Sequence, residues 1–396
     1  MKAGWATKTI ADVCSVVNGG TPKTGVSEYW DGTHQWITPA EMGKRSSPYV
    51  ARTERTITDA GMQSSSARLL PPLSVILSSR APIGHLVINT EPMATNQGCK
   101  GLVPSDGLNH KYLYYYLSSI VQLLNDLGTG ATFKELSGGK LKEVPIPVPP
   151  LAEQQRIVAI LDKAFEAIAA ARANAEQNRQ NARFLFESYL QSVFNQRGEE
   201  WVERYLVDIS KEFGRGKSKH RPRNEPKLYG GQYPFIQTGD ISRAKHWLTS
   251  YSQTYSEQGL AQSRLWPKGT ICIAIVGATV GETAILNFDA CFPDSVIGIV
   301  PDENLANGEY VEYLLQAFKQ ILKDKGKGTA RDNINLGTFE SQKFPFPPLA
   351  LQNEIVATID SLSVETQRLE SLYQRKIAAL DELKQSLLHQ AFSGNL

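Results

Sequence analysis

Two stretches of the chain are nearly the same sequence: PPLAEQQRIVAILD at Pro149–Asp162 and PPLALQNEIVATID at Pro347–Asp360. Nine of the fourteen positions are identical, and the offset of 198 residues is half of the 396-residue chain. A repeat that fills the chain in two copies predicts two similar domains related by an approximate two-fold axis. Such a protein suits a partner that is itself two-fold symmetric.

A long segment without glycine or proline begins within each motif, from Leu151 to about Gln196 and from Leu349 to about Ser393. Apolar residues recur there at spacings of three and four, which predicts long helices with a coiled-coil stripe, although Asn178 interrupts the first stripe. Each helix would be about 65 Å long at 1.5 Å per residue. Because neither helix can bury its stripe alone, we expect the two to pack against each other, antiparallel about the two-fold axis.

The segments before the helices are rich in glycine, proline and aromatic residues, with short β-branched runs, which predicts compact α+β domains. Helical spacing predicts one helix in each domain, at 111–123 and at 310–322. Proline-rich stretches at 144–150 and 344–348 should be extended, semi-rigid connections to the long helices. The predicted organisation is a first domain at 1–148, a spacer helix at 149–198, a second domain at 199–346 and a second spacer helix at 347–396.

The composition is that of an ordinary soluble protein, with 41% hydrophobic and 21% charged residues and a net charge of +2. The start of the chain lacks a signal-peptide pattern, and no run reaches the roughly 18 apolar residues of a membrane-spanning helix. We therefore expect a cytoplasmic protein without a membrane partner. The four cysteines lack metal-binding spacing, so we expect reduced, structural thiols and no metal site.

Several motifs in the first half point to a known family. They are Gly19–Thr24 (GGTPKT), Glu28–Gly32 (EYWDG) followed by Trp36–Thr38, Ser79–Gly84 (SRAPIG) and Asn96–Gly98 (NQG). These motifs resemble the target-recognition domains of the specificity subunits of type I restriction-modification systems. The repeated Pro-Pro-Leu-x-x-Gln-x-x-Ile-Val segments resemble the helical spacers of the same family, and the order of domain and helix matches along the whole chain.

The resemblance implies a non-catalytic subunit that binds a bipartite, asymmetric sequence in double-stranded DNA. It implies assembly with two methyltransferase subunits, and with restriction and translocase subunits in the full complex. No cofactor is expected on this chain, since S-adenosylmethionine would bind to the partner methyltransferase. The second domain departs from the first: Phe213–His220 lacks the Gly-Gly-Thr-Pro pattern, and Ile275–Gly281 replaces the Arg-Ala-Pro-Ile-Gly loop. Such divergence is expected if each domain reads different bases.

Two basic clusters in glycine-containing loops of the second half favour phosphate contacts over a plain solvated loop. The first runs from Arg215 to Lys227, and the second from Lys323 to Arg331. Arginine, lysine, asparagine and glutamine are the side chains that discriminate base edges, although each candidate could instead cap a turn. The candidate DNA-binding residues are Thr21, Lys23, Thr24, Arg80, Asn96, Gln97, Lys134, Arg215, Lys217, Lys219, Arg221, Gln237, Thr238, Arg243, Lys325, Lys327 and Arg331.

Two other classes of function stay open. The first is a DNA-modifying enzyme with an unrecognised active site, although Gly216–Ser218 lacks the first glycine of a phosphate-binding loop, because position 211 is lysine. The adenine-methyltransferase tetrad and the His-Glu-x-x-His zinc motif are also absent from the sequence. The second is a coiled-coil scaffold that does not bind DNA.

Overall fold

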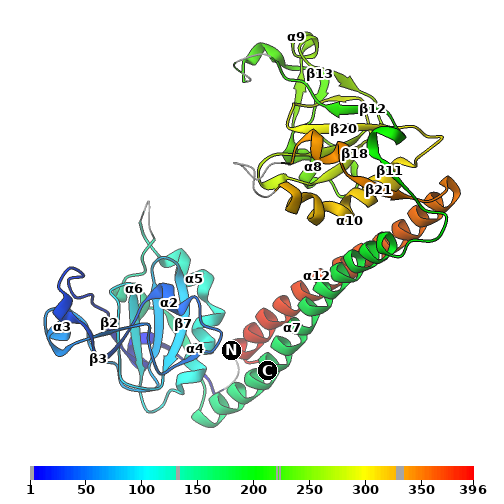
Figure 1. Ribbon diagram of the computed structural model, residues 1–396. Helices are drawn as coiled ribbons and strands as arrows, with labels where there is room; N and C mark the ends of the chain where they lie inside the picture. Colours follow the sequence, from blue (N-terminus) through cyan, green and yellow to red (C-terminus); the bar gives the residue numbers. More distant parts are fainter. Residues whose placement is uncertain (1–3, 131–133, 220–221, 223, 327–333) are drawn as a thin grey trace. The chain divides into compact units, whose positions relative to one another are not determined.

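The computed structural model describes residues 4–130, 134–219, 222, 224–326 and 334–396 (Figure 1). The chain divides into two compact units. Unit 1 comprises Met1–Glu176 and Arg375–Leu396, and unit 2 comprises Gln177–Gln374. Each unit therefore contains one predicted domain together with part of each long helix.

Unit 1 is built around a larger and a smaller sheet, and it also contains a third sheet of two strands. The larger has five strands, in the spatial order β2 (Cys14–Asn18), β9 (Cys99–Pro104), β6 (Val75–Ser79), β7 (Ile83–Asn89) and β4 (Tyr49–Val50). The smaller has β5 (Arg55–Ile57), β3 (Trp30–Ile37) and β8 (Met93–Thr95). The short helices are α1 (Ile10–Val13), η1 (Ser27–Tyr29), α2 (Pro39–Met42), α3 (Asp59–Gln63), α4 (His110–Ser119), α5 (Val121–Leu127) and α6 (Gly138–Lys142).

The central strand β6 is buried at every position, because both faces of the larger sheet are covered. On one face Leu77 packs in a cluster with Tyr112 of α4 and Leu161 of the first long helix. On the other face Ile76 packs in a separate cluster with Ile37 of β3. The larger sheet is thus the layer between the helices and the smaller sheet.

Unit 2 repeats the strand order of the larger sheet, and its smaller sheet has one strand more. Its larger sheet has the order β12 (Ser210–Arg215), β20 (Val296–Pro301), β17 (Ile271–Ala274), β18 (Thr283–Leu286) and β14 (Trp247–Leu248). Its smaller sheet has β15 (Gln253–Tyr255), β13 (Tyr229–Phe235), β19 (Ala290–Cys291) and β16 (Leu265–Trp266). The short helices are η2 (Leu206–Ile209), η3 (Pro226–Leu228), α8 (Thr238–Arg243), α9 (Glu257–Ala261), η4 (Gly277–Thr279), α10 (Gly308–Gly326) and α11 (Leu336–Glu340). The two similar α+β domains predicted from the repeat are confirmed.

The helix predicted at 310–322 is α10, but the one predicted at 111–123 is wrong as a single helix, because it breaks into α4 and α5 at Ile120. Two hydroxyls precede the break: Ser118 Oγ donates to Tyr114 O at 2.8 Å, and Ser119 Oγ donates to Tyr116 O at 2.6 Å. Serine side chains that bond back to helical carbonyls compete with the backbone and bend helices. The corresponding residues 316 and 317 of α10 are glutamine and alanine.

The proline-rich stretches are extended, as predicted, but they are not free linkers. β10 (Pro145–Val148) pairs antiparallel with β1 (Ala6–Thr9), and β21 (Lys343–Phe346) pairs in the same way with β11 (Val202–Tyr205). Proline fits here because each strand of a two-stranded sheet has an open edge that needs no N–H donor. These stretches therefore belong to the folded units.

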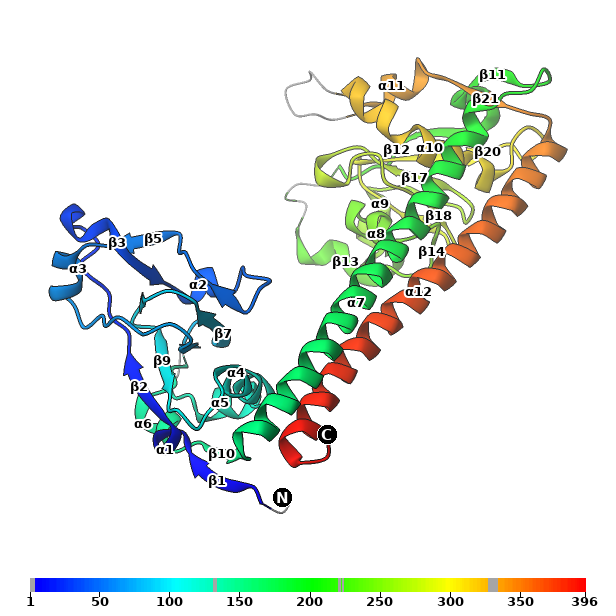
Figure 2. The ribbon, with the colours of Figure 1, turned by 90° about the horizontal axis from the view of Figure 1, so that it is seen from below.

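The two long helices, α7 (Leu151–Asn195) and α12 (Leu349–Ser393), each have 45 residues and match the predicted segments (Figure 2). In unit 1, Arg172 of α7 pairs with Asp381 of α12 at 3.3 Å, and in unit 2 Arg183 pairs with Glu370 at 3.0 Å. The residue numbers rise along one helix as they fall along the other, so the predicted antiparallel pairing is confirmed.

The apolar stripe of α7 continues on both sides of the predicted interruption, since Asn178 is exposed between buried Ala175 and Ala182.

All four cysteines are buried free thiols, and burial raises the pKa of Cys291 to about 11. None of the helices in the described ranges combines the length and the hydropathy that crossing a bilayer requires.

Candidate nucleic-acid interface

The first-half motifs gather at one end of the larger sheet of unit 1. β2 ends at Asn18 and β6 ends at Ser79, while β9 begins at Cys99 beside them. The backbone N–H of Gly19 donates to Cys99 O at 3.2 Å, which carries the Gly19–Thr24 motif across this end. The strand ends therefore bring together residues that are far apart in the sequence.

The two glycines of the first motif are required by close packing. A Cβ on Gly19 would lie 2.0 Å from Asn96 O, and one on Gly20 would lie 2.2 Å from Ala67 N. Both contacts are with backbone atoms that cannot move aside, so only glycine fits. Trp36 Nε1 also donates to Gly20 O at 2.9 Å, which links the Trp36–Thr38 motif to this loop.

Asn96 joins two of the motifs through its side chain. Its Nδ2 donates to Thr21 Oγ1 at 2.9 Å, and its Oδ1 accepts from Gly98 N at 2.7 Å. The Asn96 amide therefore shapes the turn. Lys23, Thr24 and Gln97 on the same two loops are exposed.

Arg80 lies at the end of β6, between the Gly98 turn and Glu135. Its Nη1 lies 3.7 Å from Glu135 Oε2, and a Cβ on Gly98 would lie 3.0 Å from Arg80 Nε. Glu135 also exchanges backbone hydrogen bonds with Thr129, at 3.0 and 2.9 Å, which brings exposed Lys134 to the same end. Arg80, Asn96, Thr21 and Lys134 are thus parts of one surface.

Lys100 lies beneath this surface, although its sequence pattern did not single it out. It is 6% exposed and lies opposite Asn18 in the register of β2 and β9. Burial lowers the pKa of the Lys100 ammonium, while the Glu135 carboxylate acts in the opposite direction. A buried lysine at a strand position that apolar residues usually occupy indicates a functional role. Its burial becomes known only from the pairing of the strands. In unit 2 the corresponding residue is Ile297.

Unit 2 places Arg215 at the end of β12, where unit 1 has Asn18 at the end of β2. Arg215 Nε donates to Asp294 O at 2.8 Å, and Gly216 N donates to Val296 O at 2.9 Å. Lys217 and Lys219 follow with exposed side chains. The basic segment therefore leaves the sheet at the same end as the Gly19–Thr24 motif does in unit 1.

The other candidates of unit 2 lie around α8, which packs against β17, β18 and the η4 turn. Gln237 Nε2 donates to Gln253 Oε1 at 2.5 Å, and Thr238 is the first residue of α8. Arg243 Nη2 donates to Asp240 Oδ1 at 2.5 Å, and Asp240 is only 5% exposed. Unit 1 has the same kind of pair between Arg45 and Glu41, which the sequence analysis missed.

Some candidates cannot be placed at the level of side chains. Lys325 belongs to the last turn of α10, for which the backbone alone is described. Arg221, Lys327 and Arg331 lie outside the described residues.

One family model matches both halves of the chain. The type I restriction modification DNA specificity domain matches residues 2–177 and again residues 198–377. The chain belongs to this family. It is a specificity subunit of a type I restriction-modification system, and the resemblance noted in the sequence is confirmed.

Full-length relatives support this specificity subunit assignment. The MjaIX specificity subunit of Methanocaldococcus jannaschii is 28% identical over 99% of this chain and 93% of its own length. The EcoBI specificity subunit of Escherichia coli is 25% identical over 82% of this chain and 74% of its own length. The similarity to the first of these relatives therefore extends over nearly the whole of both chains.

Solved structures support the fold of the specificity subunit. One chain, from a study of assembly and conformational transition of the type I restriction-modification system, has a TM-score of 0.80 at 18% identity and covers 100% of this chain and 99% of its own. The HsdS subunit from Thermoanaerobacter tengcongensis has a TM-score of 0.65 at 19% identity, with 100% and 98% covered. The individual DNA-contacting residues of the subunit stay predictions.

Proposed function

We propose that the two domains of this specificity subunit recognise two different DNA half-sites. A gap of bases that neither domain recognises separates the half-sites. One observation carries the proposal: the strand order of the larger sheet is the same in both units, but different side chains stand at matching positions of the register. Asn18 and Lys100 face each other across β2 and β9, whereas Arg215 and Ile297 face each other across β12 and β20. A shared framework with exchanged polar groups is what two readers of unlike base sequences require.

We further propose that the chain supplies recognition alone, and that two methyltransferase subunits, with S-adenosylmethionine bound to them, modify the DNA. Restriction and translocase subunits would join for cleavage. Family membership supports this division of labour.

The division of labour is tested by assaying methyl transfer to DNA with the purified chain alone and with its methyltransferase subunits. The expected result is incorporation only in the mixture, at a specific sequence. Methylation or cutting by the chain alone would establish the alternative of a DNA-modifying enzyme. Failure of the chain to retain or shift DNA even with its partners would instead favour the scaffold.

Arg215, Lys217 and Lys219 should contact phosphates, because they are exposed cations at the end of the sheet. Replacing all three with alanine is expected to weaken binding to many sequences alike. The slope of log K against log salt should fall in magnitude by about 3, roughly 0.9 for each lost phosphate contact. Binding titrations of the complex at several salt concentrations measure this slope.

A matched control removes the same charge elsewhere in unit 2, by alanine at exposed Lys211, Lys268 and Lys343. Lys211 and Lys268 lie toward the opposite end of the larger sheet, and Lys343 belongs to β21. An unchanged slope in the control is expected. If the first variant lost discrimination at one base position with its slope unchanged, these residues would be base readers and not phosphate contacts.

A further inference from the structure

Three side chains of unit 2 bring metal-binding atoms close together. His246 precedes β14, Glu309 lies in the first turn of α10, and Asp360 lies in α12. One ligand atom from each residue lies within 4.8 Å of the others. The three residues come from segments that are distant in the sequence, so the fold itself assembles the cluster.

The His246 ring is oriented by two further contacts. Its Nδ1–H donates to Glu312 Oε2 at 2.6 Å, and the ring stacks on Tyr313 at 4.4 Å between centroids. The fully buried Glu312 carboxylate also accepts from Thr283 Oγ1 at 2.7 Å and from the side chain of Gln316 at 2.7 and 2.9 Å. A carboxylate that accepts from Nδ1 leaves the lone pair of neutral imidazole on Nε2, which is the arrangement found behind metal-binding histidines.

Among the described residues, His246 Nε2 is buried and has no hydrogen-bond partner. A buried polar atom without a partner costs free energy unless something else occupies its lone pair or proton. The carboxylates of Glu312, Glu309 and Asp360 lie close to this ring. The field at the ring is thus negative and favours a cation.

Unit 1 provides an internal comparison at the same place in the fold. There Lys111 Nζ lies 2.7 Å from Asp162 Oδ2, and Tyr115 OH donates to Asp162 Oδ1 at 2.5 Å. Unit 2 keeps the tyrosine and the aspartate, since Tyr313 OH donates to Asp360 Oδ1 at 2.6 Å.

The lysine, however, is replaced by Glu309, 198 residues after Lys111. Where unit 1 has a lysine beside the aspartate of its long helix, unit 2 therefore has a second carboxylate. The His246 ring lies beside these two carboxylates.

We propose that His246, Glu309 and Asp360 bind one divalent transition-metal ion, which ties the start of α10 and the segment before β14 to α12. One imidazole nitrogen with two carboxylate oxygens suits Zn²⁺ and similar ions, whereas Mg²⁺ prefers oxygen ligands alone. Ligand atoms about 2.0–2.2 Å from one metal lie at most about 4.4 Å apart, so small side-chain rotations close the site. The inference does not depend on DNA reading.

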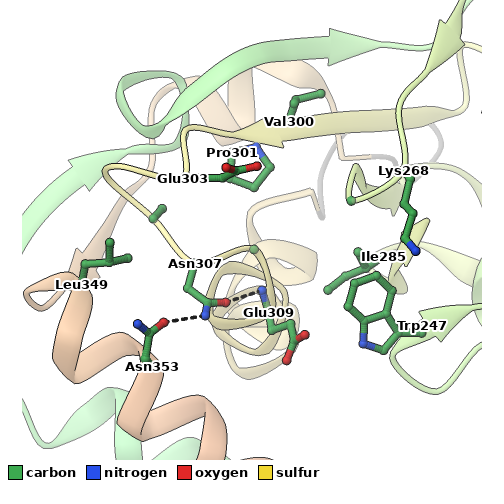
Figure 3. Close-up of a pocket in the computed structure, with 13 residues that line it drawn as sticks. Trp247, Lys268, Ile285, Val300, Pro301, Glu303, Asn307, Glu309, Leu349 and Asn353 are labelled. Carbon is green, nitrogen blue, oxygen red and sulfur yellow. Dashed lines mark hydrogen bonds between the residues drawn. The ribbon is translucent and has the colours of Figure 1, made fainter. Parts of the chain in front are cut away.

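Glu309, one of the three proposed ligands, also lines a pocket of about 370 Å³ (Figure 3). Trp247 and Asn307 line the same pocket, and Asn307 Nδ2 donates to Asn353 Oδ1 of α12 at 2.8 Å. Water in this pocket would complete the coordination of the metal, since three protein ligands leave at least one position open.

The test uses the full chain after treatment with a chelator. Calorimetric titration with Zn²⁺ should show one site per chain, and saturating Zn²⁺ should raise Tm by about 5 °C at a hundredfold excess over Kd. Co²⁺ should bind at the same site and give visible absorption bands that are characteristic of coordination by nitrogen and oxygen. Mg²⁺ at the same concentration should do neither.

The decisive variant is E309K, which recreates the lysine–aspartate pair of unit 1. It should keep the Tm of the metal-free chain or exceed it, and it should lose the calorimetric site, the Co²⁺ bands and the shift in Tm. His246→Asn should lose the same three signals. The proposal is wrong if the wild-type chain binds no Zn²⁺, or if E309K binds Zn²⁺ with the wild-type affinity and stoichiometry.

Discussion

Replacing Gln154 with alanine is expected to lower the free energy of unfolding of unit 1 by about 3 kcal/mol, because it strands several buried polar groups. Gln154 is 0% exposed. Its Oε1 accepts from Asn109 N at 2.8 Å, and its Nε2 donates to Gly107 O at 3.0 Å and to Pro149 O at 2.9 Å. One side chain thereby joins the first turn of α7 to the loop before α4 and to the end of the proline-rich stretch.

Denaturation monitored by hydrogen exchange in α4 and in residues 151–176 of α7 would measure this loss for unit 1 separately from unit 2. Gln155→Ala is the matched control, since its neighbouring side chain is exposed and should change stability by less than about 0.5 kcal/mol. Equal effects of the two substitutions would contradict the assigned role of Gln154.

Unit 2 contains the same arrangement at Gln352, which is 1% exposed. Its Oε1 accepts from Asn307 N at 2.9 Å, and its Nε2 donates to Pro347 O at 2.9 Å and to Leu305 O at 3.3 Å. These bonds give a physical reason for the repeated Pro-Pro-Leu-x-x-Gln sequence: its glutamine docks each helix onto its own domain. Gln352→Ala should therefore destabilise unit 2 by a similar amount.

Insertion of seven residues after Glu176 in α7 alone is expected to abolish methylation at the original target. The insertion lengthens one helix by about 10 Å, so the Arg183–Glu370 pair of unit 2 and the Arg172–Asp381 pair of unit 1 cannot both keep their register. Methylation of a defined DNA substrate by the assembled complex measures the loss.

The matched control for this insertion adds seven residues to both helices, after Glu176 in α7 and after Gln374 in α12, so that the pairs keep their register. It should restore methylation at targets whose gap is longer by about three base pairs, since about 34 Å corresponds to one duplex turn. We propose that the paired helices set the length of the gap. Unchanged methylation of the original target by the single insertion would contradict this proposal.

The frame of the molecule was predictable because its signals are local and repeated. The Pro149–Asp162 motif, the absence of helix breakers after it and the spacing of the apolar residues predicted both long helices and their antiparallel pairing. The break at Ile120 was not predictable from periodicity, because it follows from serine side chains that compete for backbone carbonyls. The pairing of the proline-rich strands also escaped prediction, since their partners β1 and β11 are more than a hundred residues away.

The candidate interface was predictable only where a motif marked it. The family motifs Gly19–Thr24 and Ser79–Gly84 indicated Thr21 and Arg80, and basic runs indicated Arg215 and Lys217. Lys100 was missed because its burial and its position opposite Asn18 are properties of a strand register. For the same reason the cluster of His246, Glu309 and Asp360 was missed, and the sequence analysis expected no metal site.

Each domain is proposed to recognise its own DNA half-site. Methylation-sensitive sequencing of DNA from cells that carry this chain and its methyltransferase subunits tests it most directly, with Arg80→Ala as the comparison. For the wild-type chain we predict two different half-sites separated by a fixed gap. In the variant, discrimination between bases should relax in only one half-site, and each lost base contact should cost about 1–3 kcal/mol of binding free energy. A single continuous recognition sequence, or a variant that alters the recognition of both half-sites together, would contradict this proposal.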